Sequence, residues 1–206
     1  MDISSLFDVR GRSALVTGGS LGIGAMIAEG LVRAGVNVWI CSRKAADIAA
    51  TRDRLSEWGT CHALAADLSQ DAGIEAVVRS LGDQPLDILV NNAGASWAAP
   101  IEAYPRAGFD KVLNLNVTAP FFLLIQRLLP NLRGATSPEA PARIINIASI
   151  DGLRPPVTGQ FRLLCQQGGH DHVDPSPCES SCHRWHNGKR HCSWYLPVED
   201  DSILVR

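Results

Sequence analysis

This 206-residue sequence lacks a long apolar segment, a basic excess and an N-terminal secretory pattern. Its longest apolar stretch, residues 119–125, contains Pro120 and is followed by Gln126 and Arg127, so it is too short to span a bilayer. The net charge of −2 gives no sign of a nucleic-acid partner. Residues 1–12 show no basic region followed by an apolar one, so no secretory signal is expected. We expect a soluble, cytoplasmic globular protein without nucleic-acid or membrane partners.

Cysteine and histidine are scarce up to residue 160 and concentrated after it. Four of the six cysteines and five of the six histidines lie there, and no apolar periodicity long enough for a helix remains. A zinc site is one interpretation, but the spacing matches no standard zinc finger and adjacent ligands cannot all point inward. A disulfide framework does not suit a reducing compartment. We therefore predict no metal site and keep a zinc-binding interaction protein as an alternative; its ligands would be Cys178, Cys182, His183, His186, His191 and Cys192.

The most informative stretch is SALVTGGSLGIG at residues 13–24. A short apolar run that stops at Thr17 and opens into glycines predicts a buried parallel strand turning into a helix. Glycine lets the backbone approach a ligand closely, and the first turn of the helix points unpaired N–H groups at whatever lies over the loop. The stretch therefore predicts a pyrophosphate site, although its G-x-x-x-G-x-G spacing differs from the commoner G-x-G-x-x-G and such turns also occur for packing reasons.

Strand and helix patterns alternate along the next 130 residues. Alternation of this kind implies right-handed crossovers and a parallel sheet covered on both faces. Expected strands are residues 14–16, 36–40, 62–66, 86–90 and 143–147, and expected helices are residues 25–34, 45–58 and 72–81, with one or two long helices within 101–132, punctuated by Pro105, Pro120 and Pro130.

Ligands of such sheets bind outside the carboxyl ends of the strands. After the second strand there is no carboxylate to accept from a ribose 2′-hydroxyl, and Arg43 and Lys44 could instead meet a 2′-phosphate, which favours NADP over NAD. The alternative is that both residues merely begin a solvated helix. After the third strand Asp67 could meet an adenine edge, or it could cap the next helix.

Five ordered motifs give the chain a family resemblance: TGGSLGIG at 17–24, the Asp67-Leu68 pair, NNAG at 91–94, Asn116 within LNVTAPF, and IINIAS ending at Ser149. In these motifs the chain resembles the short-chain dehydrogenase/reductases from residue 6 to about residue 160. The residues of these motifs, with Ser96 and Trp97 after NNAG, are most similar to those of NADPH-dependent 3-oxoacyl reductases of the rhamnolipid-pathway type. The resemblance implies a three-layer Rossmann fold, strand order 3-2-1-4-5, and reduction of a ketone, such as a 3-oxoacyl thioester, with NADP(H).

The same resemblance implies a role for each motif. Ser149 would hydrogen-bond the substrate carbonyl, and Asn116 would anchor a proton relay. Hydride delivery to a ketone leaves a developing alkoxide that must be protonated as it forms. The residues expected to hold the cofactor are Gly18, Ser20, Leu21, Gly22, Ile23, Gly24, Arg43, Asp67, Leu68, Asn91, Ala93 and Gly94.

The sequence then departs from the family pattern. The family places a Tyr as general acid, with a Lys four residues later, thirteen or fourteen residues beyond Ser149. No Tyr-x-x-x-Lys occurs after residue 160, where Tyr195 is the single tyrosine. We therefore expect the chain as written to be catalytically incompetent. A non-enzymatic NADP-binding fragment is an alternative function.

The genetic code offers an explanation for this departure. Degenerate codons from Leu163 to Gly168, read one base later, permit Tyr-x-Ala-Ser-Lys-Ala. Codons for residues 185–194 permit G-I-T-V-N-A-I-A-P-G, the family's sixth-strand signature. We therefore interpret residues 1–160 as an NADP-binding Rossmann domain truncated after strand five, and residues 161–206 as a frame-shifted or disordered tail.

A truncation at this point predicts further physical consequences. The family's interface helix would be missing, so the usual homo-oligomeric state cannot be carried over. The fifth strand is expected to present an unpaired edge and apolar surface, which favours aggregation.

Overall fold

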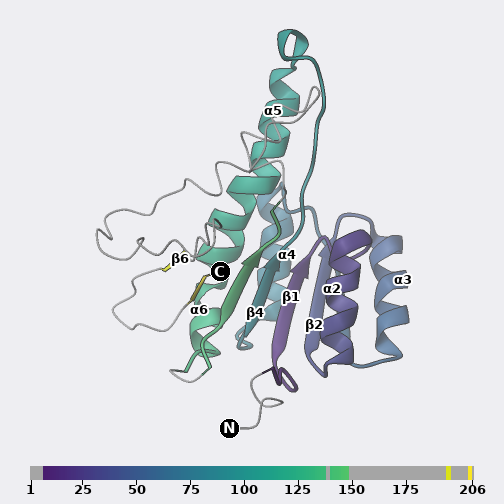
Figure 1. Ribbon diagram of the computed structural model, residues 1–206, viewed down its shortest axis with the longest axis vertical. Helices are drawn as coiled ribbons and strands as arrows, with labels where there is room; N and C mark the ends of the chain where they lie inside the picture. The colour runs from purple at the N-terminus through teal and green to yellow at the C-terminus, as the bar shows by residue number, and fades with distance from the viewer. Residues whose placement is uncertain (1–6, 138–139, 149–193, 196–203, 206) are drawn as a thin grey trace, which may run out of the picture.

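The computed structural model describes residues 7–137, 140–148, 194–195 and 204–205. Five parallel strands alternate with helices, and their order in the sheet is β3-β2-β1-β4-β5. The predicted three-layer, doubly wound Rossmann-type α/β fold is therefore confirmed (Figure 1). These strands are β1 (Ser13–Thr17), β2 (Asn37–Ser42), β3 (Cys61–Ala65), β4 (Ile88–Asn91) and β5 (Arg143–Asn146).

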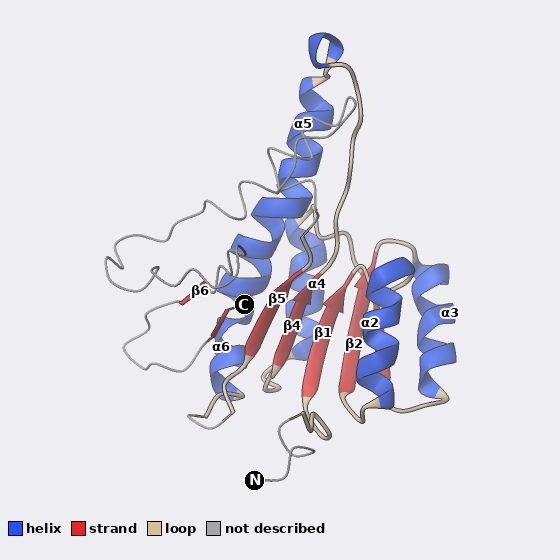
Figure 2. Ribbon diagram, viewed as in Figure 1, coloured by secondary structure: helices blue, strands red, loops and turns tan. Residues whose placement is uncertain are grey.

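Helices lie on both faces of the sheet (Figure 2). α2 (Gly22–Arg33) and α3 (Ala45–Ser56) cover one face, and α4 (Asp71–Leu81) with the helical segment that follows β4 covers the other. Side chains alternate along a strand, so Ala14 and Val16 of β1 join the core under α2 while Leu15 joins the core on the α4 face. Both cores are apolar and buried, which fixes the strand register.

The register brings the carboxyl ends of the strands together. Thr17 pairs with Cys41 at the end of β2, and Asn91 pairs with Asn146 across β4 and β5. The residues predicted to hold a ligand therefore gather at one edge of the sheet.

The helical segment after β4 agrees with the predicted one or two long helices but not with the predicted breaks at Pro120 and Pro130. It comprises η1 (Ile101–Ala103), α5 (Arg106–Leu113), the π-helical η2 (Asn114–Gln126) and α6 (Arg127–Gly134), and the last three run on without interruption. Pro105 is the N-cap residue of α5 and so marks a helix boundary, as its predicted punctuation implies, but Pro120 and Pro130 lie inside helices. Proline has no N–H, so the usual bond from residue 120 to the Asn116 carbonyl cannot form; the wider π winding of η2 accommodates this loss.

The predicted unpaired edge of β5 is wrong for the first half of the strand. The short strand β7 (Leu204–Val205) pairs in parallel with Arg143 and Ile144, and β6 (Trp194–Tyr195) pairs with β7. The predicted apolar surface is present, because Ile145 and Ile147 are 40% and 38% exposed on the face away from α4. The rest of the predicted tail, residues 161–193, 196–203 and 206, lies outside the described residues.

No single helix in the described part of the chain is long and apolar enough to cross a membrane. Arg106–Phe122 and Arg127–Gly134 pass the test of length and composition only as a pair, and they are bent by 45°.

Candidate functional site

The glycine loop between β1 and α2 is shaped by close backbone packing. Gly18 and Gly22 have positive φ angles of 65° and 56°, a region that side chains rarely adopt. A Cβ on Gly24 would overlap the Gly18 carbonyl oxygen and the Asn92 amide nitrogen. The loop is therefore pressed against the segment that follows β4.

Thr17 holds these two segments together. Its buried hydroxyl accepts hydrogen bonds from the backbone N–H groups of Asn92 and Ala93, each at 2.9 Å, and lies 3.2 Å from the Val90 carbonyl. The Asn92 side-chain amide donates to the carbonyls of Thr17 at 2.9 Å and Gly18 at 3.3 Å. Sequence reasoning assigned no role to Thr17 or to the side chain of Asn92.

The first turn of α2 is suited to an anion. Its N-cap residue, Leu21, makes no side-chain capping bond, and the first turn contains no acidic residue. The N–H groups at this helix end are therefore not satisfied by a side-chain cap, and the helix dipole favours negative charge there. A Cβ on Gly22 would meet nothing within 4 Å, so the backbone is open to a ligand. Leu21 and Ile23 are 66% and 60% exposed beside it. These features fit a pyrophosphate group.

The two basic residues after β2, Arg43 and Lys44, have different surroundings. Lys44 forms a long ion pair with Asp47 (3.7 Å) and is well exposed, as expected for a residue that begins a solvated helix. Arg43 instead lies close enough to Asp67 for its charge to lower the pKa of that carboxyl. The buried Ser20 donates its hydroxyl to the Ser42 hydroxyl at 2.9 Å, which ties the glycine loop to the end of β2.

Asp67 stabilises the turn after β3. Its carboxylate accepts bonds from the Ser69 hydroxyl at 2.7 Å and the Ser69 N–H at 3.0 Å, while Gln70 is the N-cap of α4. The alternative that Asp67 caps this helix is therefore wrong. Burial raises the pKa of Asp67, but the two Ser69 bonds and the charges of Arg43 and Lys111 lower it below its usual value. Leu68 is 4% exposed and packs in the core, so its role at a cofactor stays a prediction.

Amide side chains join the ends of β4 and β5. The Asn91 amide nitrogen donates to the Asn146 side-chain oxygen at 2.8 Å. The Asn91 side-chain oxygen is buried and has no partner within the described part of the chain. Sequence reasoning did not assign Asn146 a role.

Asn116 positions the loop that leaves β4. Its side-chain oxygen accepts from the Ala95 N–H at 2.7 Å, and its amide nitrogen donates to the Ala95 carbonyl at 2.9 Å. A Cβ on Gly94 would lie 3.6 Å from the same side-chain oxygen. Asn116 therefore fixes the backbone just after the NNAG motif.

The other predicted catalytic residue, Ser149, lies outside the described residues. Within the described ranges, no group of three or more His, Cys, Asp or Glu residues is arranged to hold a metal ion.

Comparison with known proteins establishes the family of this chain. The family model described as short chain dehydrogenase matches residues 12–160, more than half of the chain. The chain belongs to the short-chain dehydrogenase family. Among family members, the rhamnolipids biosynthesis 3-oxoacyl-[acyl-carrier-protein] reductase of Pseudomonas aeruginosa is 54% identical over 149 residues, which are 71% of this chain and 58% of that protein. Gluconate 5-dehydrogenase of Gluconobacter oxydans is 35% identical over 158 residues, 73% of this chain and 58% of that protein.

A solved structure is also similar to this chain. The Pseudomonas aeruginosa RhlG/NADP active-site complex superposes with a TM-score of 0.76 at 49% identity, covering 80% of this chain and 64% of that one. The chain thus spans less than two thirds of the length of each of these three similar proteins.

Proposed function

We propose that this short-chain dehydrogenase chain binds NADP(H) at the carboxyl ends of β1 to β4. The observation that carries this proposal is the uncapped first turn of α2 behind a glycine loop whose backbone is open to solvent at Gly22. The NADP complex of the Pseudomonas relative supports it. Arg43 directly follows β2, and no residue at the end of this strand offers a carboxylate to the ribose 2′-hydroxyl, which favours the 2′-phosphate of NADP over the free hydroxyl of NAD.

The predicted contacts fall into three groups along the cofactor. The glycine loop would hold the pyrophosphate, Arg43 the 2′-phosphate, and the β3 and β4 ends the adenine and the nicotinamide half. The proposed set is Gly18, Ser20, Leu21, Gly22, Ile23, Gly24, Arg43, Asp67, Leu68, Asn91, Ala93 and Gly94.

We further propose that the lineage reduces a ketone, a 3-oxoacyl thioester, to a secondary alcohol. Bound NADPH supplies the hydride in such a reduction. The protein must hold the carbonyl and deliver a proton, and Ser149 and Asn116 cannot deliver it by themselves. Because the sequence has no Tyr-x-x-x-Lys after residue 160, we expect this chain to bind the cofactor with little or no turnover.

Residues 161–206 are proposed to be translated in a shifted reading frame. The family match ends at residue 160, where the shift is inferred from codon degeneracy. The β7 pairing with β5 does not bear on this proposal, because a two-residue strand needs little sequence specificity. A cytoplasmic location and assembly with other copies stay predictions.

The test compares two proteins made from the same gene. The first is the chain as written, and the second has the next reading frame restored from codon 161 onward. NADPH oxidation is followed with a 3-oxoacyl thioester. We expect NADPH binding by both and turnover only by the restored protein. Stop codons in the next frame would refute the frame shift, and stoichiometric zinc in the unmodified chain would favour the zinc-binding alternative.

A further inference from the structure

Trp97 is held in a fixed position on the loop that rises from the proposed cofactor site. Its ring lies against helix α5 at Gly108, where a Cβ would come within 2.8 Å of Cδ2 and 3.0 Å of Cε2. The Tyr104 hydroxyl donates to the Trp97 carbonyl at 2.8 Å. Despite these contacts, the residue is 39% exposed. The chain therefore presents part of a large apolar ring to solvent in one orientation.

Gly108 lies within an eight-residue helix and is buried. A glycine inside a helix costs about 1 kcal/mol relative to alanine. An alanine here would place its Cβ against the indole ring and force the ring to shift. Lys111, 5.9 Å from the ring centroid, adds a weak cation–π contact. Glycine at position 108 therefore lowers the stability of the helix but leaves room for the indole ring.

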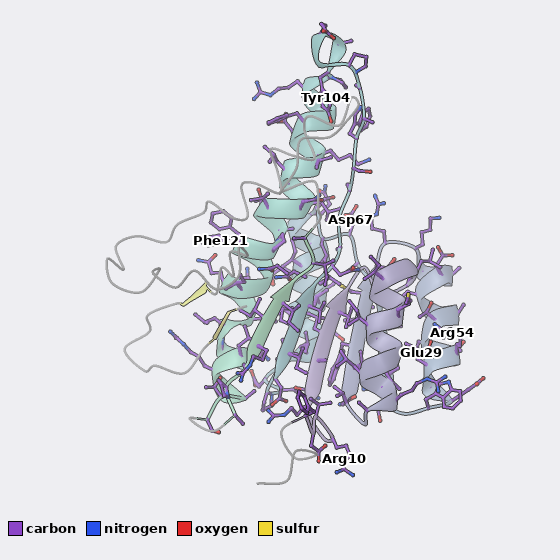
Figure 3. The ribbon with its side chains drawn as sticks, in the orientation of Figure 1. Arg10, Glu29, Arg54, Asp67, Tyr104 and Phe121 are labelled. Carbon is purple, nitrogen blue, oxygen red and sulfur yellow. The ribbon has the colours of Figure 1, made fainter. Side chains whose placement is uncertain are left out.

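The loop that carries the ring leaves the predicted reaction centre at Ala95. Ala95 is held to Asn116 by two hydrogen bonds. Trp97 follows Ala95 by two residues, so the Cα atoms of Ala95 and Trp97 are at most about 7 Å apart. In Figure 3, Tyr104, which donates to the Trp97 backbone, is on the part of the chain that extends beyond the strand ends and Asp67. A substrate held beside Asn116 with a chain running outward can reach the indole.

We propose that Trp97 is a specificity-determining residue that binds the apolar chain of a 3-oxoacyl thioester. This inference rests on the proposed function and refines it. A long hydrocarbon chain that packs on the exposed indole binds more tightly, because burying apolar surface is favourable. A hydroxylated sugar acid has little apolar surface to bury there, so its binding is not strengthened comparably. Trp97 therefore favours 3-oxoacyl thioesters over sugar acids, the two substrate classes named in the similar 3-oxoacyl-[acyl-carrier-protein] reductase and gluconate 5-dehydrogenase.

The test measures thioester binding to the full chain saturated with NADP⁺, by calorimetry. The probes are 3-oxodecanoyl-CoA and 3-oxobutanoyl-CoA. Trp97→Ala is expected to weaken binding of the ten-carbon thioester about tenfold and that of the four-carbon thioester less than twofold. Gly108→Ala, which keeps the indole but displaces it, should reduce the same chain-length preference.

Trp58→Ala is the matched control. Trp58 is 52% exposed, and the Arg33 guanidinium carbon lies 3.6 Å from its ring centroid. It lies between α3 and the start of β3, away from the carboxyl ends of the strands. It should leave both thioester affinities unchanged. NADPH binding and thermal unfolding are recorded for each variant, with Trp97→Phe as a second variant that retains a ring and most of the preference.

The two proposals fail in different ways. Absence of NADPH binding would refute the proposed function. NADPH binding with a chain-length preference that survives Trp97→Ala would refute only the role of Trp97, as would failure of the unmodified chain to bind either thioester.

Discussion

Replacing Gly24 with alanine tests the packing between the glycine loop and the β4 end. The new methyl group would overlap the Gly18 carbonyl oxygen and the Asn92 amide nitrogen, and it would lie 2.9 Å from the Gly18 carbonyl carbon. Two of these neighbours are backbone atoms, so they cannot move aside by a change of rotamer. The Asn92 amide must then give up its bonds to Thr17 and Gly18.

The magnitude follows from three terms. Gly→Ala inside a helix gains about 1 kcal/mol. Overpacking costs about 1–3 kcal/mol, and each lost hydrogen bond costs about 1 kcal/mol. We expect Gly24→Ala to lower the free energy of unfolding by about 2–4 kcal/mol.

Gly30→Ala is the matched control in the same helix. A Cβ at this position meets nothing within 4 Å, so the variant should gain about 0.5–1 kcal/mol. Urea unfolding measures both effects, and NADPH titration should show weaker binding by Gly24→Ala alone. Equal stability of the two variants with equal NADPH affinity would refute the packing argument.

Three further predictions concern other contacts. Thr17→Val leaves the N–H groups of Asn92 and Ala93 without their acceptor, and urea unfolding should show a loss of about 2–4 kcal/mol; a loss below about 0.5 kcal/mol would contradict the role of the hydroxyl. Ser42→Asp places a carboxylate at the end of β2 and should abolish preferential NADPH binding in titrations against NADH, whereas an unchanged preference would show that Arg43 does not contact the 2′-phosphate. Burial raises the pKa of the Cys41 thiol to about 12. The unfolded thiol ionises first, so the free energy of unfolding should fall as pH rises above about 8.5, and Cys41→Ala should flatten that slope by up to about 1.4 kcal/mol per pH unit.

Local patterns predict most of the fold. The five strand segments and three of the helices follow from apolar periodicity and glycine punctuation, with ends displaced by a few residues. Pro120 misleads because the wider π-helix accommodates it where an α-helix would end or kink, and Pro130 misleads because it lies within α6. The β5 edge also escapes prediction, since its partner β7 comes from about 60 residues later in the chain and is too short to leave a pattern.

The candidate site is less predictable than the fold. Glycines and basic residues can be identified as candidate site residues from their type and position in the sequence. The hydrogen bonds of Thr17 with Asn92 and of Asn91 with Asn146 cannot, because they join segments far apart in sequence. The different surroundings of Arg43 and Lys44 also cannot be predicted from the sequence, because the two residues are adjacent and alike in charge. Only their surroundings, Asp67 for one and Asp47 for the other, distinguish them.

Equilibrium binding of NADPH and NADH to the unmodified chain tests the central claim most directly. Saturable binding of one NADPH per chain is predicted, with weaker binding of NADH and a loss of that preference in Arg43→Ala. Failure of the folded chain to bind NADPH, or equal affinity for both dinucleotides, would contradict the account.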